Sequence, residues 1–474
     1  MANIKKNFAY NSVLTLSTYV INLFLFPYVA RVLGVDIVGK ISFVNNVISY
    51  FSLFALLGLP ILGIREIAAC QGNREKRSEV FSSLIFIILC STILLSTIYI
   101  VSIFIVERFF QVRELFFLGL FLLVSTSFSI EWFFQGVEDF KFVTVRTLLV
   151  KLIYFFLVIF FIKSQDDYCL YYLMSVLVVF VNAIISVIYT KQYVDISFKK
   201  VKIQHYIKSS LSFGLYRVIL SMYITFNVVY LGFLCSDTEV GYYYTATKLL
   251  TIAMGVLTAF TNVMMPRMSN LLSEGKMYEF QTAISKSFDL VLSLSFPIAI
   301  GLAVLAPQII RVLAGEGYEG AIVPMRIVMF NVLSIGISQI YVLQILIPQK
   351  KDKVVLISSI WGLIAGVTLN ILLVSRLAAI GSAITLIISE FAGDSYNYYY
   401  VSKKKLINSP LPRILKYLFF SIPYVLFFYV PQLISDNNVI ILVSSIVMAT
   451  IYFIVLHRNI IRGTVLSDLI RRYI

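Results

Sequence analysis

Apolar runs of about 20 residues recur along the whole chain, and they limit its fold more than any other feature. A run of this length crosses the hydrocarbon core of a bilayer as an α-helix. In lipid, a helix also satisfies its own backbone hydrogen bonds. Of the 474 residues, 59% are hydrophobic and only 13% are charged, which is far from the balance of a soluble domain. The sequence therefore predicts an all-α integral membrane protein.

The pattern predicts fourteen transmembrane helices. They cover residues 8–32, 40–63, 80–105, 115–136, 144–162, 168–190, 209–234, 241–265, 284–306, 322–347, 354–374, 377–400, 415–434 and 438–457. The longest polar stretch, residues 191–210, is too short to hold a soluble domain. We therefore expect the function to lie within the membrane bundle.

The positions of the basic residues predict the orientation of these spans, because cytoplasmic loops retain Lys and Arg. With the N-terminus inside, most of the 39 basic residues, Arg146 among them, fall in inner segments. The net charge of +15 then lies on the inner face, and both termini are cytoplasmic. Anionic lipids of the inner leaflet are the natural partner of this charge. We expect no nucleic acid partner.

The stretch RVLGVDIVGKIS, residues 31–42, is similar to a phosphate-binding loop but lacks its last element. The pattern G-x-x-x-x-G-K-[ST] needs a magnesium-binding hydroxyl where this chain has Ile41. The stretch also joins the first two spans on the outer side, where there is no ATP. We interpret Gly34 and Gly39 as turn residues between two antiparallel helices.

Cysteine and histidine residues form no recognisable pattern. The four cysteines are dispersed in or beside spans, and the two histidines lie in inner segments. This distribution predicts neither a disulfide framework nor a metal site. We expect no cofactor, apart from coupling to H⁺ or Na⁺.

An internal repeat organises the chain. Residues 33–51 and 231–253 each have Leu-Gly closing one span and, after a short turn, Val-Gly opening the next. The offset equals six spans, so both copies keep the same orientation, as in transporters that rock two lobes about a central cavity. We expect an N-lobe at 1–200 with spans one to six and a C-lobe at 201–405 with spans seven to twelve. Residues 406–474 then form two added helices and a cytoplasmic tail.

Five stretches from the first span to the twelfth carry a family resemblance. They are ARVLGVDIVGKISF, LLGLPILGIREIAA, SIEWFFQGVEDFKFV, VGYYYTATKLL and LNILLVSRLAAIGSAITLIISEF. In this order they resemble the polysaccharide repeat-unit flippases, the Wzx-type O-antigen and capsule translocases of the multidrug/oligosaccharidyl-lipid/polysaccharide exporter superfamily. The resemblance implies two six-helix lobes in the bacterial cytoplasmic membrane. It also implies export of an undecaprenyl-pyrophosphate-linked oligosaccharide to the outer leaflet by alternating access.

Six basic residues are candidates for binding the anionic head of such a cargo. They are Lys151, Arg217, Lys248 and Arg326 within spans, and Arg31 and Lys40 at the outer mouth. Charges within spans are costly, so they tend to face water-filled cavities or to pair with one another. The alternative for Arg326, Arg31 and Lys40 is that they only extend to the membrane interface.

Four acidic residues within spans are candidates for ion coupling. They are Glu131, Asp289, Glu390 and Asp394. Glu390 and Asp394 are four residues apart and share one face of a helix. Two neighbouring carboxylates in a low dielectric favour binding of a proton or a cation. The alternative is that these acids simply pair with Lys151 or Arg217.

Two other functions stay open. A drug or small-solute exporter of the same superfamily is one, although four cations within spans would repel cationic drugs. A membrane polysaccharide polymerase is the other, but its chemistry usually needs a long outer loop, and the outer loops here are short. We therefore expect no enzyme. The expected partners are the lipid-linked glycan, membrane lipids, and a polysaccharide polymerase or export machinery.

Overall fold

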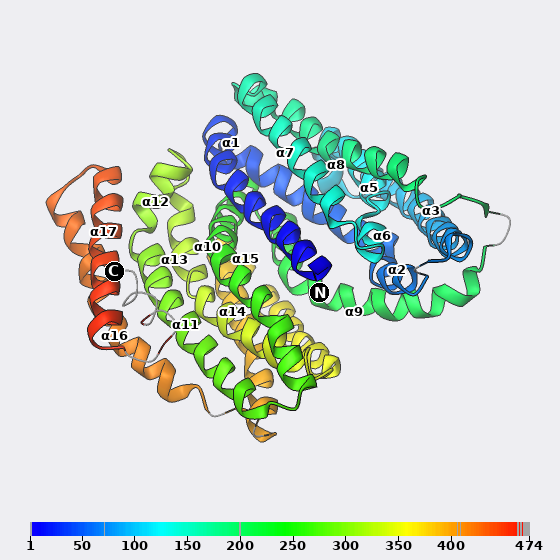
Figure 1. Ribbon diagram of the computed structural model, residues 1–474. Coiled ribbons are helices and arrows are strands. Elements are labelled where there is room, and N and C mark those ends of the chain that lie inside the picture. The colour runs from blue at the N-terminus through cyan, green and yellow to red at the C-terminus, as the bar shows by residue number, and fades with distance from the viewer. Residues whose placement is uncertain are drawn as a thin grey trace. The chain divides into compact units, whose positions relative to one another are not determined.

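The computed structural model describes residues 2–70, 72–198, 201–404, 406–407, 409–461, 464 and 467. Within helices, the side chains of residues 2–5, 8, 208–209, 212–213, 215–217, 220 and 222–224 are not described. All regular secondary structure in the described residues is helical (Figure 1). Eleven candidate spans among them are long and apolar enough to cross a membrane. The predicted class, an all-α multi-pass membrane protein, is confirmed.

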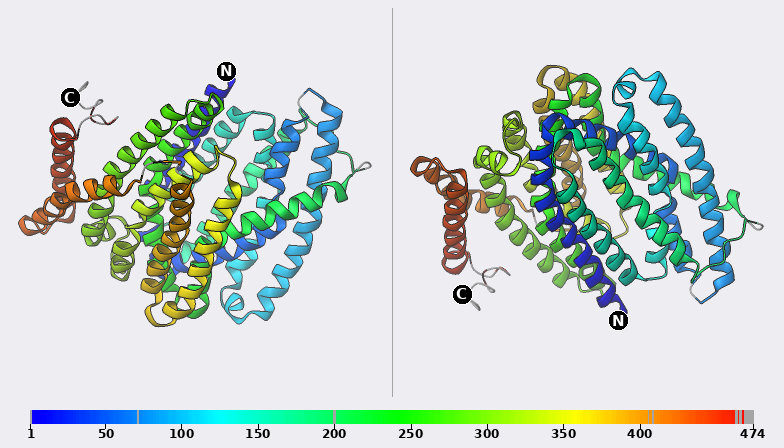
Figure 2. Two further views of the ribbon diagram at one scale, coloured as in Figure 1. Left: turned by 90° about the horizontal axis from the view of Figure 1, so that it is seen from below. Right: turned by 90° about the horizontal axis from the view of Figure 1, so that it is seen from above.

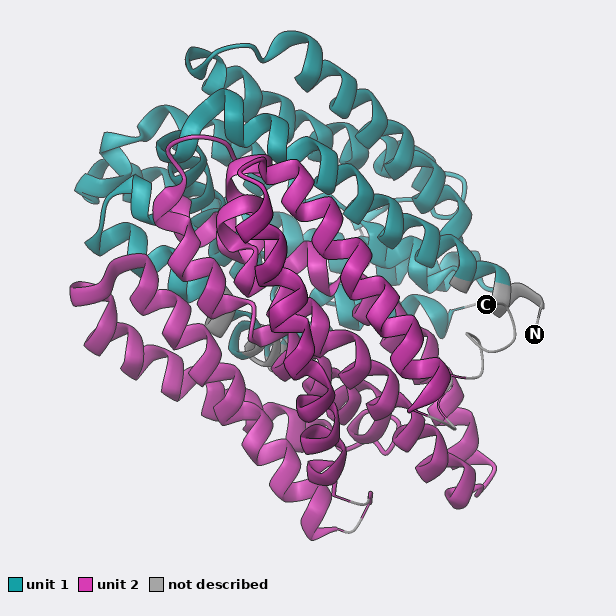
Figure 3. Cartoon of the chain, turned by 90° about the vertical axis from the view of Figure 1, so that its left-hand side faces the viewer, with its two compact units in different colours: residues 1–240 teal, residues 241–474 magenta. Residues whose placement is uncertain are grey.

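The chain forms two compact units, residues 1–240 and 241–474 (Figure 3). Unit 1 contains α1 (Ala2–Leu56), α2 (Leu59–Ala68), α3 (Arg74–Ile105), α4 (Glu107–Gln111), α5 (Arg113–Ser127), α6 (Glu131–Gly136), α7 (Phe140–Phe161), η1 (Gln165–Asp167), α8 (Tyr168–Thr190) and α9 (Ile203–Leu234). α10 (Asp237–Ser273) begins in unit 1 and continues in unit 2. Unit 2 also contains α11 (Met277–Val304), α12 (Ala306–Leu313), η3 (Glu319–Ala321), α13 (Ile322–Val328), α14 (Asn331–Gln339), η4 (Ile340–Leu346), α15 (Asp352–Lys403), α16 (Leu411–Ile434) and α17 (Asn438–Asn459).

Two long helices are broken by a residue with a positive φ angle. Gly34 in α1 has a φ of 77°, and Ala378 in α15 has a φ of 46°. Glycine adopts such angles at little steric cost. The prediction of a turn is confirmed at Gly34 and is wrong at Gly39, because one break suffices and the helix has already resumed there. Each break separates two apolar segments that correspond to two predicted spans. The total of fourteen spans stays a prediction.

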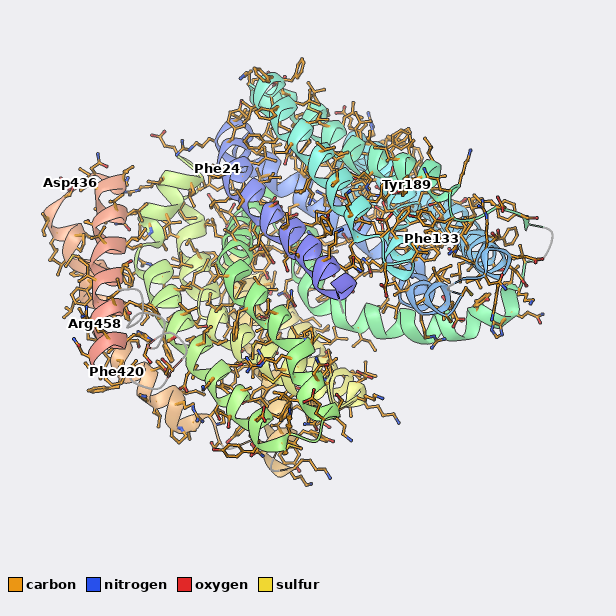
Figure 4. The ribbon with its side chains drawn as sticks, in the orientation of Figure 1. Phe24, Phe133, Tyr189, Phe420, Asp436 and Arg458 are labelled. Carbon is orange, nitrogen blue, oxygen red and sulfur yellow. The ribbon has the colours of Figure 1, made fainter. Side chains whose placement is uncertain are left out.

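The core of unit 1 forms where α2, α3 and α6 meet. α6 buries three consecutive aromatic side chains, Trp132, Phe133 and Phe134. Gly63 of α2 lies against the Trp132 ring so closely that a Cβ atom would clash with it. The missing side chain at Gly63 thus allows the short helices α2 and α6 to pack together. In Figure 4, Phe133 and Tyr189 mark this aromatic region.

α9 packs against α1 and α2 within unit 1. Ser210 near its start donates a hydrogen bond to the carbonyl oxygen of Leu57 at 2.6 Å. At its other end, Arg108 of α4 donates to the carbonyl oxygen of Gly232 at 2.9 Å and forms an ion pair with Asp237. Unit 1 therefore includes a helix that the sequence repeat assigns to the second lobe. The lobe boundaries expected from the repeat stay predictions.

The core of unit 2 forms between α11, α14, η4 and α16. Phe288 of α11 packs edge-on against Tyr341 of η4, with ring centroids 5.8 Å apart. η4 is a π-helix, a form that occurs mostly as a short bulge and often at functional sites. α16 and α17, orange and red in Figure 2, pack against each other, and the Tyr452 hydroxyl donates to the carbonyl oxygen of Phe420 at 3.0 Å.

Candidate functional site

An ion pair with a buried arginine joins α6 to α7 in unit 1. Nη2 of Arg146 donates to Oε1 of Glu131 at 2.7 Å, and Nη1 donates to the Ser186 hydroxyl of α8. The Arg146 side chain is only 3% exposed, whereas that of Glu131 is 44% exposed. The guanidinium carbon also lies 5.5 Å from the centre of the Phe142 ring, within the range of a cation–π contact. Glu131 therefore pairs with Arg146, a residue that is not among the partners, Lys151 and Arg217, named by the alternative expectation.

Lys151 lies further along the same helix and faces α1. Its Nζ donates to the Thr18 hydroxyl at 2.9 Å, and the side chain is half-buried. About two helical turns before Lys151, the Thr144 hydroxyl donates to the carbonyl oxygen of Tyr10 at 3.2 Å. α7 therefore carries a polar face that includes Lys151 and contacts α1 within the expected membrane span.

The other candidate cations of unit 1 differ in their surroundings. Arg31 and Lys40 lie on opposite sides of the break at Gly34, with Arg31 exposed and Lys40 half-buried. Lys40 lines a small polar cavity together with Arg113. The backbone of Arg217 lies in α9, but its side chain is outside the described residues.

In unit 2, the two candidate cations lie on different helices. Lys248 on α10 is half-buried, and its Nζ is 6.0 Å from the centre of the Tyr244 ring. Arg326 on α13 is exposed, as expected for a side chain that extends to the interface. Of the two, Lys248 is the more buried.

Asp394 lies where α15 meets α14. Its Oδ2 accepts a hydrogen bond from the Ser334 hydroxyl at 2.9 Å. Ser338 and Asn397 also interact with the carboxylate through their side chains. No Lys, Arg or His forms an ion pair with Asp394 in the part of the chain that the structure describes. Glu390 lies one helical turn earlier on the same face, so the two acids share a helix face as expected.

Asp289 on α11 has a different environment. Its Oδ1 lies 3.6 Å from Nε of Arg413 on α16, and the two side chains are 18% and 31% exposed. The pair connects α16 to the core of unit 2. We therefore assign Asp289 a structural contact with Arg413, which is not among the partners expected for it.

Sequence reasoning missed two groups of residues in these sites. The charge pattern places Arg146, at the edge of a predicted span, in an inner segment, whereas the structure buries its side chain. Ser334 and Ser338 are four residues apart on an apolar helix, a spacing that places two hydroxyls on one face. That spacing is the signal that could have identified a polar partner for Asp394. Among the described residues, no group of three or more His, Cys, Asp or Glu side chains is arranged to hold a metal ion.

Residues 4–272, more than half of the chain, match a family described as "Polysaccharide biosynthesis protein". A protein of Escherichia coli (strain K12) named "Putative O-antigen transporter" is 25% identical over 414 residues, which cover 85% of this chain and 98% of that protein. A protein of the same name from Shigella dysenteriae is 26% identical over 377 residues, covering 79% of this chain and 94% of that protein.

Two solved structures show that the fold is shared with membrane transporters. "Lipid II flippase MurJ, inward closed conformation" is similar with a TM-score of 0.73 at 17% identity, covering 95% of this chain and 99% of that one. The inward-facing conformation of a multidrug resistance MATE family transporter of the MOP superfamily has a TM-score of 0.62 at 14% identity, covering 83% and 99%. One fold thus serves two kinds of cargo, and the cargo must be argued from the site.

Proposed function

The chain belongs to the polysaccharide biosynthesis protein family, and from this premise we propose that it is a flippase for a lipid-linked saccharide. The relatives named as O-antigen transporters support this, because the similarity covers nearly their whole length. The fold shared with a lipid II flippase supports it as well. The role is transport rather than catalysis.

We also propose which cargo the protein moves and in which direction. The cargo is an undecaprenyl-pyrophosphate-linked oligosaccharide repeat unit, and it moves from the inner to the outer leaflet of the bacterial cytoplasmic membrane. Movement occurs by alternating access between two lobes, with both termini in the cytoplasm. A polysaccharide polymerase or export machinery then takes over the cargo at the outer face.

The observation that carries this proposal is the half-buried cation within apolar helices of each unit. Lys151 in unit 1 and Lys248 in unit 2 are both half-buried within expected spans. Charges within spans are costly, and they tend to face polar groups or water-filled cavities. A pyrophosphate head group supplies a partner for such a charge, while a cationic drug would be repelled. This contrast favours the flippase over the drug exporter.

The membrane potential limits how much ion coupling this cargo requires. Moving one negative charge outward gains roughly 2.3 kcal/mol per 100 mV when the cell interior is negative. A pyrophosphate with about two negative charges therefore gains about 4 to 5 kcal/mol. Export of such a cargo can proceed with weak coupling or with none.

Where coupling occurs, we assign it to Asp394. Glu131 is paired with Arg146, and Asp289 lies beside Arg413. Asp394 instead receives hydrogen bonds from neutral groups. A carboxylate in this setting needs H⁺ or Na⁺ to balance its charge. Glu390, one turn away, is the second candidate in the same site.

The test is deletion of the gene in its own host, followed by extraction of undecaprenyl-linked glycans and a measurement of the leaflet that they face. We expect complete repeat units to accumulate on the cytoplasmic side, and the intact protein to restore export. Lys248→Ala or Arg217→Ala should abolish surface glycan while the protein remains in the membrane. Normal glycan in both variants would remove the cationic-cavity proposal. Normal glycan export with altered drug tolerance in the deletion strain would favour the exporter instead.

A further inference from the structure

A polar cavity of about 350 Å³ lies in unit 1 where three segments distant in sequence meet. The first is α1 after its break at Gly34, which contributes Lys40. The second is the junction of α4 and α5, which contributes Phe110, Gln111, Arg113 and Glu114 among others. The third is the start of α8, which contributes Tyr168. The expected orientation places all three segments at the outer ends of their helices.

The charges of this cavity are not balanced. Lys40 and Arg113 form no ion pair in the described part of the chain, and the Arg113 guanidinium carbon lies 4.7 Å from the centre of the Phe110 ring. Glu114 is already engaged, because the Tyr168 hydroxyl donates to its Oε2 at 3.0 Å. The cavity is therefore lined by two cations, Lys40 and Arg113, and by one carboxylate, Glu114, so its net charge is positive.

A neighbouring arginine shows what a structural cation looks like in this region. Arg108 lies on α4, three residues before Gln111, and forms an ion pair with Asp237. It also donates to the carbonyl oxygen of Gly232 at 2.9 Å. Arg108 therefore has partners from α9 and the start of α10, whereas Arg113 contacts only an aromatic ring among the interactions described for it.

The wall that carries Tyr168 is held in place before any ligand binds. The Asp167 carboxylate accepts hydrogen bonds from the backbone N–H groups of Lys163 and Ser164, at 2.8 and 2.9 Å. The bond from the Ser164 N–H belongs to a capping box between Ser164 and Asp167 at the start of η1, and both bonds fix the entry to α8. The side chain of Gln165 also lies against Gly34, with its Nε2 3.0 Å from where a Cβ atom would be. α1 and the start of α8 are thus tied together next to the cavity.

We propose that this cavity is an anion site on the outer face that binds a phosphate group. Arginine recognises phosphate oxygens with two parallel N–H donors, and lysine adds a point charge. Gln111 also lines the cavity; its Oε1 accepts from Nη1 of Arg108 at 3.4 Å, and its side-chain N–H groups are the donors that it can offer to an anion. A volume of about 350 Å³ holds a phosphate or pyrophosphate but not a whole oligosaccharide repeat unit. The site therefore binds the phosphate end of a ligand and leaves the glycan outside.

The phosphate has two sources, a lipid head group or a free ion. If the source is the lipid-linked cargo, the site receives its phosphate end after the crossing, and this reading rests on the proposed function. Binding to the outer site would then favour release of the head group from the membrane-embedded cations. A free phosphate ion would use the same cavity without any link to transport.

The test measures binding to the full-length protein in lipid nanodiscs. Inorganic pyrophosphate is titrated in one arm, and undecaprenyl phosphate is built into the nanodisc in the other. We expect the double variant Lys40→Gln/Arg113→Gln to weaken binding at least ten-fold, since each residue supplies charge-assisted hydrogen bonds. The control is Lys163→Gln, which removes one outer charge whose Nζ is instead bonded to the carbonyl oxygen of Ile159. Binding to this control should equal that of the unchanged protein.

A charge-preserving variant guards against loss of folding. Lys40→Arg/Arg113→Lys should bind within a few-fold of the unchanged protein if charge is what matters. Loss confined to the lipid arm identifies the lipid head group, and loss confined to the pyrophosphate arm identifies the free ion. Unchanged binding in both arms for a folded double variant would overturn the site.

This outcome is separable from failure of the proposed function. If the deletion strain exports glycan normally while the cavity still binds pyrophosphate, the flippase proposal fails and the anion site stands. If export depends on the protein but the double variant binds both probes normally, the site fails and the flippase proposal stands.

Discussion

The ion pair between Arg146 and Glu131 makes an asymmetric prediction about stability. Arg146 is 3% exposed and Glu131 is 44% exposed, so the two charges do not depend on each other equally. Glu131→Gln leaves a buried guanidinium without a counter-charge. Arg146→Met leaves a carboxylate that water can still reach. The first change should therefore cost more stability than the second, although both remove the same ion pair.

The magnitudes follow from the burial of each partner. Removing one member of a buried pair costs about 3 to 5 kcal/mol when the other charge is stranded. We expect about 3 kcal/mol for Glu131→Gln, the low end, because Ser186 and Thr147 still accept hydrogen bonds from Arg146. Arg146→Met should cost about 1 kcal/mol, close to an exposed pair. The double variant should be more stable than Glu131→Gln alone, since no charge is then stranded.

The assay is equilibrium unfolding of the purified protein in mixed detergent micelles, with thermal unfolding as a second measure. A mild effect of Glu131→Gln together with a severe effect of Arg146→Met would refute the reasoning. A stable Glu131→Gln variant that loses glycan export would assign Glu131 to ion coupling instead. The variant Lys141→Gln, an exposed basic residue at the start of α7, serves as the control for a change of charge alone.

Three further predictions follow from particular contacts. Asp394→Asn should remove any dependence of glycan export on H⁺ or Na⁺ with little loss of stability. Asp289→Asn should instead mainly lower stability, because it weakens the contact with Arg413. Equal ion dependence of export in Asp394→Asn and in the unchanged protein would contradict the coupling assignment. Gly34→Ala should lower the thermal midpoint of unfolding more than Gly275→Ala. Both glycines have a positive φ, but a neighbouring side chain lies within 4 Å of the added Cβ only at Gly34. Equal shifts of the midpoint would show that the contact with Gln165 adds nothing. A single cysteine at Ser236 should react with a membrane-impermeant reagent added outside intact cells and one at Ser402 should not, and the opposite labelling would reverse the orientation.

Some features of this protein could be predicted from sequence because they depend on short segments. A bilayer of fixed thickness requires about 20 apolar residues per span, so the membrane class can be recognised from each run separately. The break in α1 coincides with Gly34, and a glycine in such a stretch is a local signal. The break in α15 falls at Ala378, the second residue of the predicted span 377–400, and no glycine stands at this position.

The partners of the charged residues could not be predicted in this way. Pairing of charges depends on which faces of the helices contact each other. The free-energy difference between two alternative ion pairs is small compared with the free energy of inserting the spans into the membrane. Glu131 could have paired with Lys151 on the same helix as Arg146, but the packing of α6, α7 and α8 brings it to Arg146.

The cavity lined by Lys40 and Arg113 shows the same division between sequence and tertiary structure. The sequence predicts Lys40 as a candidate, because the charge pattern places this cation at the expected outer mouth. Its partners Arg113 and Tyr168 come from segments far along the chain, and only the packing of α1, α5 and α8 assembles them. The sequence by itself thus determined that the chain spans a membrane and which charged residues lie within the predicted spans. The tertiary structure decided which charged side chains pair with one another, because side chains distant in sequence meet only when the helices have packed.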